Sequence, residues 1–403
     1  MIFEARIERV VGELKAGLNL PLAIELWNGK RYALGERPTV TLRVPAASAA
    51  KYLAKADLAK LGEAFVEGHI DVEGPMGDAV RAAESLARRL GGDRKGRLPA
   101  LLRNLHTRKV DAEAIRYHYD VSNEFYALWL DERMVYSCAY YQSGEEPIAL
   151  AQEQKLDHVC RKLMLRPGDR FLDIGCGWGA LAMHAAKHYG ATALGITLSR
   201  NQHALANERL KAAGLQDRCE VRLQDYRDVP GEGVFDKIAS IGMFEHVGLK
   251  NLPVYFGAIR RLLVEGGIVL NHGITSVDPE SRSVGLGGGD FIGKYVFPHG
   301  ELPHLSLVIK AMGAAGLEVM DSETLRLHYA KTLQQWSDRL EAKLEQAHAF
   351  TGDKRLRIWR VYLAGCAHAF AQGWVSIQQV LAVKRGDPQK NPLPWTRQYM
   401  YTR

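Results

Sequence analysis

From about Asp111 to its end, the chain alternates short apolar runs with longer amphipathic stretches. Five of the runs have the length and composition of buried strand cores: 171–174, 193–196, 221–223, 238–241 and 268–270. Segments of helical composition separate them, including 180–189 and 202–213. The alternation predicts an α/β domain with a doubly wound, mostly parallel sheet, in which ligands bind at the carboxyl ends of the strands.

The first 80 residues follow another pattern. Apolar and polar positions alternate at 24–27 and 40–44, with the turn residues Asn28 and Gly29 between them, and 47–61 has helical composition. A Gly-rich, charged run at 91–96 then breaks regular structure. We therefore predict a small N-terminal α+β domain (1–80), a linker (81–110) and a catalytic domain (111–403).

The positive charge of the chain is concentrated in the predicted linker. Residues 81–109 contain nine basic and two acidic residues, an excess that equals the net charge of +7 of the whole chain. Leucines interleave with these basic residues, as in segments that bind anionic lipid surfaces, although a solvated linker would have the same charge. The segment has no aromatic side chain for base stacking, which disfavours nucleic acid as a partner.

Other bulk features narrow the class of protein. No apolar run reaches the roughly 18 residues of a spanning helix, and the first residues do not form a secretory signal, so we expect a cytoplasmic protein. The five cysteines show no CxxC spacing, which argues against disulfides and structural zinc. His299, Glu301 and His304 fit no familiar zinc pattern, and we expect no metal.

The strongest single motif is the loop Asp173-Ile174-Gly175-Cys176-Gly177-Trp178-Gly179, which follows a strand core and precedes a helix. A dinucleotide enzyme would carry a carboxylate about 20 residues later, but residues 195–199 contain none. We therefore predict S-adenosylmethionine as the cofactor, with Asp173 orienting the loop and the amino end of the cofactor. Asp225 and Tyr226, which end the third strand core, would meet its adenine.

Longer motifs resemble one family. Residues 172–179, 195–202 and 243–248 are similar to the cyclopropane fatty acid synthases, whose relatives include the mycolic acid cyclopropane synthases. Further similarity lies at 117–120, 136–140, 295–303 and 328–333, so that the resemblance covers about 111–385. It implies a seven-stranded, Rossmann-like methyltransferase sheet. The N-terminal domain and basic linker resemble the longer members of the family, which act on phospholipids.

The resemblance implies methyl transfer to a cis double bond of an unsaturated acyl chain in phospholipid. Bicarbonate then removes a proton from the added methyl group, and a cyclopropane ring closes. The implied bicarbonate site consists of Cys138, Glu245, His272, Ile274 and Tyr329. The implied cofactor site consists of Tyr136, Ser137, Asp173, Gly175, Gly177, Thr197, Leu198, Gln202, Asp225, Tyr226 and Ile241.

An alkene loses no proton before it attacks a methyl group, so the site must first supply proximity, dryness and stabilisation of positive charge. Aromatic faces suit a cation, and Tyr140, Phe244 and Tyr295 are candidates, with core packing as the alternative. Cys138 is not expected to be a nucleophile, because no positive residue adjoins it in the sequence.

Partners follow from the resemblance: a phospholipid surface at the inner face of the membrane, and a second copy of the chain in a homodimer. Three other functions stay open. The enzyme could leave a methyl or methylene branch instead of a ring. It could be a small-molecule N-methyltransferase, although residues 1–110 would then have no evident use. It could also be a lipid-binding protein with an inactive methyltransferase fold.

Overall fold

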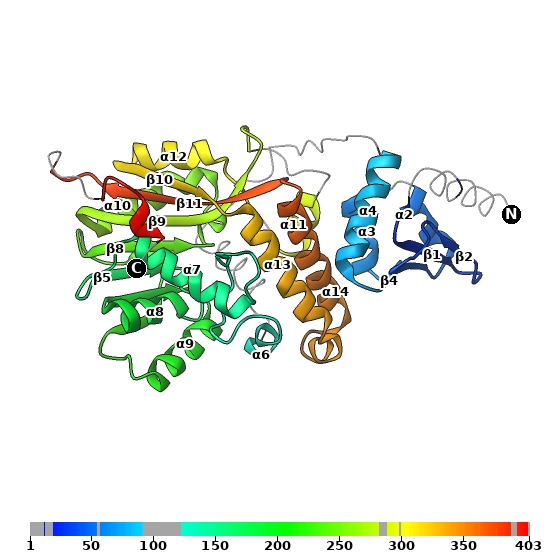
Figure 1. Cartoon of the computed structure of the whole chain (residues 1–403), viewed down its shortest axis with the longest axis horizontal. Coiled ribbons are helices and arrows are strands. Elements are labelled where there is room, and N and C mark those ends of the chain that lie inside the picture. Colours follow the sequence, from blue (N-terminus) through cyan, green and yellow to red (C-terminus); the bar gives the residue numbers. More distant parts are fainter. Residues whose placement is uncertain are drawn as a thin grey trace. The chain divides into compact units, whose positions relative to one another are not determined.

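A computed structural model describes Gly12 and residues 19–54, 57–91, 122–281, 288–297, 300–387 and 393–401. The chain divides into two compact units, each formed by separate segments (Figure 1). Unit 1 comprises 1–99, 282–298 and 333–372, and unit 2 comprises 100–281, 299–332 and 373–403. Most of the predicted basic linker (92–110), the motif at 117–120 and His299 lie outside the described residues.

Unit 1 contains a four-stranded sheet in the order β2-β1-β3-β4. Its strands are β1 Leu22–Leu26, β2 Arg31–Ala33, β3 Val40–Val44 and β4 Asp71–Glu73. The structure confirms the two predicted strands as β1 and β3, which pair in parallel. The sequence did not predict β2 and β4, because each has only three residues and no buried side chain to produce an apolar pattern.

The helical stretch predicted at 47–61 is interrupted in the structure. It forms η1 Ala47–Ala50, α2 Lys51–Ala54 and α3 Leu58–Val66. Asp57 has an extended backbone, and its side chain accepts a hydrogen bond from the N–H of Lys60. Asp57 therefore caps the amino terminus of α3, and the chain enters a new helix there. The remaining helices of unit 1 are α4 Met76–Gly91, α11 Gly288–Tyr295, the second part of α13 Arg326–Glu341 and α14 Leu344–Ala371.

Helix α4 crosses the predicted boundary at residue 80 and continues to Gly91. Ala82 and Leu86, one helical turn apart, are buried in the core of unit 1. The buried carboxylate of Glu84 also contacts His368 of α14 at 2.6 Å. The beginning of the predicted linker is thus an amphipathic helix, whose periodicity is hidden by its many charges. Unit 1 also takes in 282–298 and 333–372, which we had assigned to the catalytic domain.

Unit 2 contains the predicted seven-stranded sheet, with strand order β10-β11-β9-β8-β5-β6-β7. Its strands are β5 Arg170–Ile174, β6 Thr192–Thr197, β7 Cys219–Leu223, β8 Phe235–Ile241, β9 Leu263–Ser276, β10 Leu317–Thr324 and β11 Val375–Lys384. Only β11 runs antiparallel to its neighbours, so the sheet is mostly parallel. The apolar pattern did not reveal β11, because its ten buried residues include Gln378, Gln379 and Lys384.

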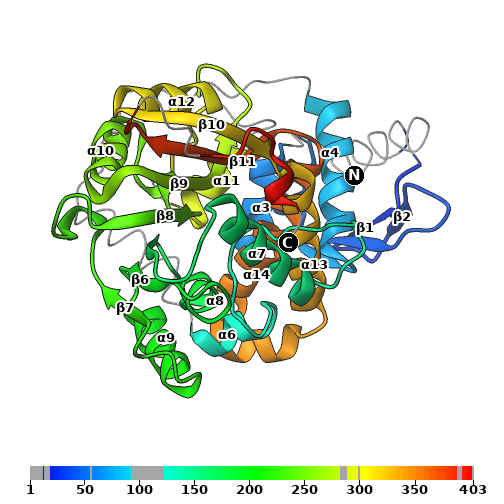
Figure 2. The same ribbon diagram turned by 60° about the vertical axis from the view of Figure 1, so that its left-hand side comes forward.

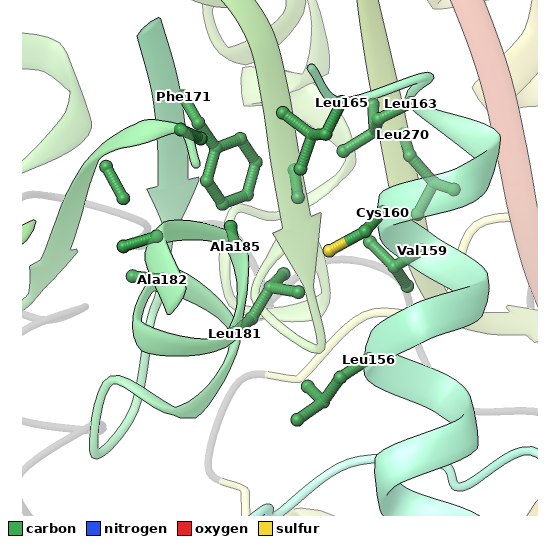
Figure 3. Close-up of a cluster of buried hydrophobic side chains, with 14 of the residues drawn as sticks. Leu156, Val159, Cys160, Leu163, Leu165, Phe171, Leu181, Ala182, Ala185 and Leu270 are labelled. Atoms are coloured by element: carbon green, nitrogen blue, oxygen red, sulfur yellow. The ribbon is translucent and has the colours of Figure 1, made fainter. Parts of the chain in front are cut away.

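Helices cover both faces of this sheet (Figures 1 and 2). Buried side chains of α7 Ile148–Lys162, α8 Ala180–Tyr189 and α9 Arg200–Ala212 form the core on one face, together with Phe171 of β5. Figure 3 shows Leu156 and Cys160 of α7 facing Leu181 and Ala185 of α8 in this core. Helices α10 Leu252–Leu262 and α12 Leu305–Ala314 form the core on the other face.

Short elements complete unit 2: α6 Asn123–Ala127, η3 Tyr226–Asp228, η4 Phe244–His246, η5 Leu249–Asn251 and η7 Gln398–Met400. Both η3 and η4 directly follow the carboxyl ends of parallel strands, where the sheet is not covered by long helices. Within the part of the chain that the structure describes, no helix combines the length and apolarity needed to cross a bilayer.

A buried ionic cluster connects α7 to β10. Glu323 accepts hydrogen bonds from Lys162 Nζ at 2.5 Å and from His158 Nε2 at 2.7 Å, and both of these side chains are fully buried. Burial lowers the pKa of Lys162, which Glu323 partly offsets. Burial also acts to raise the pKa of Glu323, but the bonds from His158 and Lys162 prevail and lower it to about 2. The cluster therefore keeps its charges only while all partners are present.

Replacing Lys162 with methionine is expected to destabilise the protein by roughly 3–5 kcal/mol, because it leaves a buried carboxylate without its ammonium partner. Urea unfolding would measure the change. Lys211→Met, at an exposed position near the end of α9, is the matched control and should change stability by less than about 0.5 kcal/mol. Equal effects of the two substitutions would contradict the prediction.

Candidate active site

A pocket of about 1140 Å³, counted with its open mouth, lies at the carboxyl ends of β5, β6, β7 and β8. Each strand contributes residues that follow its last apolar position. Every residue predicted to bind the cofactor lines this one pocket: Tyr136, Ser137, Asp173, Gly175, Gly177, Thr197, Leu198, Gln202, Asp225, Tyr226 and Ile241. The structure thus brings together residues from five separate segments of the sequence.

The glycine loop forms the floor of the pocket between β5 and α8. Gly175 and Gly177 have φ angles of 80° and 56°, in the left-handed region that other residues rarely adopt. The N–H groups of Gly175 and Cys176 both donate to the carbonyl of Ile196 in β6, at 2.9 Å. The turn is therefore tied to the neighbouring strand, and its backbone lies open to a ligand.

Hydrogen bonds arrange the polar side chains at the ends of β6 and β7. Thr197 Oγ1 donates to Gln202 Oε1 at 2.8 Å, and both residues are buried. Asp225 accepts two hydrogen bonds from the guanidinium of Arg227, at 2.8 and 2.6 Å. Sequence reasoning missed Arg227, which lies over the ring of Tyr226 and fixes the orientation of Asp225. The signal available in the sequence was an arginine two residues after Asp225, the predicted carboxylate.

Several buried polar atoms near the pocket, among them Gln379 Oε1, have no hydrogen-bond partner among the described residues, and two of them belong to predicted site residues. These two are Glu245 Oε2, in η4 just after β8, and His272 Nε2, in β9. The two strands are neighbours, since Ile241 at the end of β8 pairs with His272. The Nδ1 atom of His272 lies 3.3 Å from Nε2 of Gln379 in β11. Buried polar atoms are nearly always paired, so these two are candidates for contact with a small ligand or water.

The N–H of Ile274, expected to face a bound anion, instead donates to Glu245 Oε1 at 2.7 Å. This contact joins η4 to β9 and holds the carboxylate in place. It needs a close approach of the two elements, which Gly273 permits: a Cβ atom there would lie 1.9 Å from the ring of Phe244. Ile274 therefore positions Glu245 in this structure.

A chain of contacts links the other two predicted anion-site residues to Ile274. The carbonyl of Leu325 accepts from the N–H of Tyr329 at 3.0 Å and lies 3.8 Å from Cys138 Sγ. The N–H of Leu325 donates to the carbonyl of Ile377 in β11, which pairs with Ile274. Burial raises the pKa of the Cys138 thiol well above its ordinary value, so the thiol stays protonated.

Burial also sets the protonation of the acidic and basic groups here. It raises the pKa of Glu245 to about 7 and that of Asp173 to about 7. It lowers the pKa of His272 well below the ordinary value, and the nearby Lys155 adds to this effect. The imidazole is therefore neutral at physiological pH. Among the described ranges, no group of three or more His, Cys, Asp or Glu side chains could hold a metal ion.

Glu245→Gln is expected to stabilise the protein at neutral pH. The folded pKa of about 7 exceeds the ordinary value of 4.5, so the unfolded chain loses its proton first as the pH rises. The stability of the wild type relative to the variant should thus fall between pH 4.5 and about 7. Urea unfolding of both proteins across this range would measure the difference, and a pH-independent difference would contradict the prediction.

The three aromatic residues predicted to face a cation have different surroundings. Tyr140 stacks on His158 and His328, with ring centroids 4.1 and 5.0 Å away. Phe244 is buried against Gly273. Tyr295 belongs to unit 1, where its hydroxyl donates to Glu67 at 2.9 Å. Each ring thus makes a packing or hydrogen-bonding contact within its own unit.

Comparison with known families identifies this fold. The sequence model of the mycolic acid cyclopropane synthetase family matches residues 106–380. The chain belongs to this family. It is therefore an S-adenosylmethionine-dependent methyltransferase. A second family, described only as a domain of unknown function, matches residues 12–90.

Individual relatives agree with membership of the mycolic acid cyclopropane synthetase family. A probable fatty acid methyltransferase from Pseudomonas putida is 51% identical over 388 residues, which are 95% of this chain and 97% of the relative. The cyclopropane-fatty-acyl-phospholipid synthase of Escherichia coli K12 is 36% identical over 70% of each chain. A mycolic acid cyclopropane synthase solved with SAH and CTAB is 34% identical, with a TM-score of 0.64 over 68% of this chain and 98% of that one.

Proposed function

We propose that the enzyme transfers the methyl group of S-adenosylmethionine to a cis double bond in an unsaturated phospholipid acyl chain and closes a cyclopropane ring. Its relatives include enzymes named for fatty acid methylation and for cyclopropane formation on phospholipid, which supports a lipid acyl chain as the substrate. The observation that carries the ring product is the pair of unpartnered buried atoms, Glu245 Oε2 and His272 Nε2, beside the cofactor pocket.

The order of the strands supports one direction for the cofactor. Across the edge of the sheet the order is β7, β6, β5, β8, β9. Adenine would lie at Asp225 and Tyr226 after β7, the ribose at Thr197 and Gln202 after β6, and the methionyl group at Asp173 after β5. Bound there, S-adenosylmethionine supplies an electrophilic methyl group on its sulfonium. Glu245, in η4 after β8, and His272, in β9, follow next in the order of the elements along this edge.

The residues present fit a small anion that accepts a proton, and we propose bicarbonate. An alkene loses no proton before it attacks the methyl group, so a base is needed only after methyl transfer. Bicarbonate would supply that base. Glu245 Oε2 would accept a hydrogen bond from its hydroxyl group, and His272 Nε2 would donate to one of its oxygens. Tyr329, in α13, and Cys138, which approaches Leu325 just before α13, would complete the site.

Gln379 supports the donor role of His272. In the arrangement found here, the amide N–H of Gln379 points at Nδ1 of His272, 3.3 Å away, so Nδ1 is the acceptor. The proton of the neutral imidazole then lies on Nε2, the atom that has no partner. Sequence reasoning missed Gln379, which we propose sets the tautomer of His272.

The product of the reaction tests the proposal. Purified enzyme is incubated with methyl-labelled S-adenosylmethionine and vesicles of an oleoyl phospholipid, and the lipids are analysed by mass spectrometry and proton NMR. We expect one added CH2 per modified chain, the shielded protons of a cyclopropane ring, and a slower reaction when bicarbonate is depleted. Olefinic methylene or branched methyl signals without ring protons would overturn the ring.

Methyl or methylene branching of the same chain is the second candidate. The name of the Pseudomonas putida relative, a probable fatty acid methyltransferase, is compatible with it. A saturated methyl branch needs no base for a proton of the added methyl group, so it would leave Glu245 Oε2 and His272 Nε2 without a use. Label transfer to free amines alone, with none to lipid, would instead favour a small-molecule N-methyltransferase.

A further inference from the structure

Lys155 is a buried lysine that lines the cofactor pocket from α7. Its Nζ donates a hydrogen bond to Ser137 Oγ at 2.9 Å, and no carboxylate of the described residues forms an ion pair with it. Lys162, seven residues later on the same helix, is also buried but is paired with Glu323. A buried ammonium whose protein partner is a neutral hydroxyl is costly, which indicates that a ligand supplies the missing negative charge.

Asp173 presents the opposite charge to the same pocket. It ends β5 directly before the glycine loop, and its side chain is almost fully buried. Its carboxylate makes no hydrogen bond with the described residues, although it lines the pocket together with Lys155 and Ser137. Burial raises the pKa of Asp173 to about 7, while the charge of Lys155 opposes this rise. One end of the pocket therefore offers an ammonium and a carboxylate, both without an ionic partner in contact.

An amino acid zwitterion is the ligand group that matches these two charges. The methionyl end of S-adenosylmethionine is such a zwitterion, and the proposed direction of the cofactor would bring it to Asp173. We propose that Lys155 binds the α-carboxylate of the cofactor, while Asp173 faces its α-ammonium. This inference rests on the assignment of the cofactor and not on the ring product.

The contact between Lys155 and Ser137 relates the binding of the α-carboxylate to the neighbouring segment. Ser137 lies next to Cys138, whose Sγ is 3.8 Å from the carbonyl of Leu325 beside the proposed anion site. When the carboxylate binds, Lys155 Nζ would contact both the ligand and Ser137. Binding of the carboxylate would therefore connect the cofactor, through Lys155, to the segment that carries Ser137 and Cys138.

Calorimetry with two ligands tests the role of Lys155. S-adenosylhomocysteine carries the amino acid group, whereas 5′-deoxy-5′-methylthioadenosine lacks it but keeps the adenosine. With the full-length protein, Lys155→Met should weaken the binding of S-adenosylhomocysteine roughly 30-fold or more. The binding of methylthioadenosine should stay within about threefold of wild type, because its contacts lie at the other end of the pocket. Lys155→Gln, which keeps a donor to Ser137, should give the same result if the methionine variant folds poorly.

Lys162→Met is the matched control from the same helix. It should lower the stability of the protein while leaving the affinity for S-adenosylhomocysteine within about threefold of wild type. If the Lys155 variants lost affinity for S-adenosylhomocysteine and methylthioadenosine equally, Lys155 would only support the pocket. If their affinity for S-adenosylhomocysteine were unchanged, Lys155 would not contact the carboxylate. Either result overturns the proposal. A wild type that binds neither ligand would overturn the cofactor assignment as well, whereas a branched lipid product would leave the role of Lys155 intact.

Discussion

Glutamine in place of Glu245 is expected to lower kcat by roughly 10²–10³-fold while leaving the affinity for S-adenosylhomocysteine unchanged. Glutamine keeps the oxygen that accepts from Ile274, so the contact between η4 and β9 survives. It replaces Oε2, the unpartnered acceptor, with an amide that can only donate. The hydroxyl of bicarbonate would then face a donor, and the base would be misplaced. Single-turnover kinetics with labelled cofactor, combined with calorimetry, would measure the two effects.

The matched control is Glu208→Gln, on the exposed face of α9, which should change neither quantity. Because removal of the buried charge favours folding at neutral pH, the loss of activity in Glu245→Gln cannot arise from unfolding. A parallel loss of cofactor affinity would place Glu245 in the cofactor site instead. A kcat within threefold of wild type would remove Glu245 from the proposed mechanism.

Alanine in place of Gly273 is expected to destabilise the protein by roughly 1–3 kcal/mol and to lower kcat about 10²-fold. The new Cβ would lie 1.9 and 2.2 Å from two ring atoms of Phe244, which is buried and cannot leave its place freely. Either η4 or β9 must therefore move, and the bond between Glu245 and Ile274 is lost. Urea unfolding and kinetics of the purified variant would measure both changes.

Two further variants isolate this steric cause. Gly257→Ala, in α10, adds a Cβ with no atom within 4 Å and should leave stability unchanged or raise it by up to about 1 kcal/mol. Phe244→Leu in the Gly273→Ala background removes the ring edge and should recover part of the stability, as expected for two residues in contact. Strictly additive effects of the two substitutions would contradict the steric explanation.

The residues predicted to bind the cofactor line one pocket because most of them follow a simple rule. They stand where parallel strands end, and in a doubly wound sheet these ends meet at one edge. Tyr136 and Ser137 do not follow a strand, and only the family motif indicated them. The division of the chain was less accurate, since 282–298 and 333–372 belong to unit 1, and no local pattern shows which distant segments pack together.

The sequence by itself determined the strand cores from β5 to β9, the glycine loop between β5 and α8, and the polar residues that stand at the strand ends, because these depend on local periodicity and on adjacent residues. Only the tertiary structure shows the contacts of Lys155, Gln379 and the N–H of Ile274. Lys155 occupies an ordinary helical position, and its importance comes from its burial in a pocket where it forms no ion pair with a carboxylate of the described residues. Gln379 reaches His272 because β11 inserts antiparallel to β9, a pairing of residues more than 100 positions apart. Such contacts depend on burial and on long-range register, which no local pattern encodes.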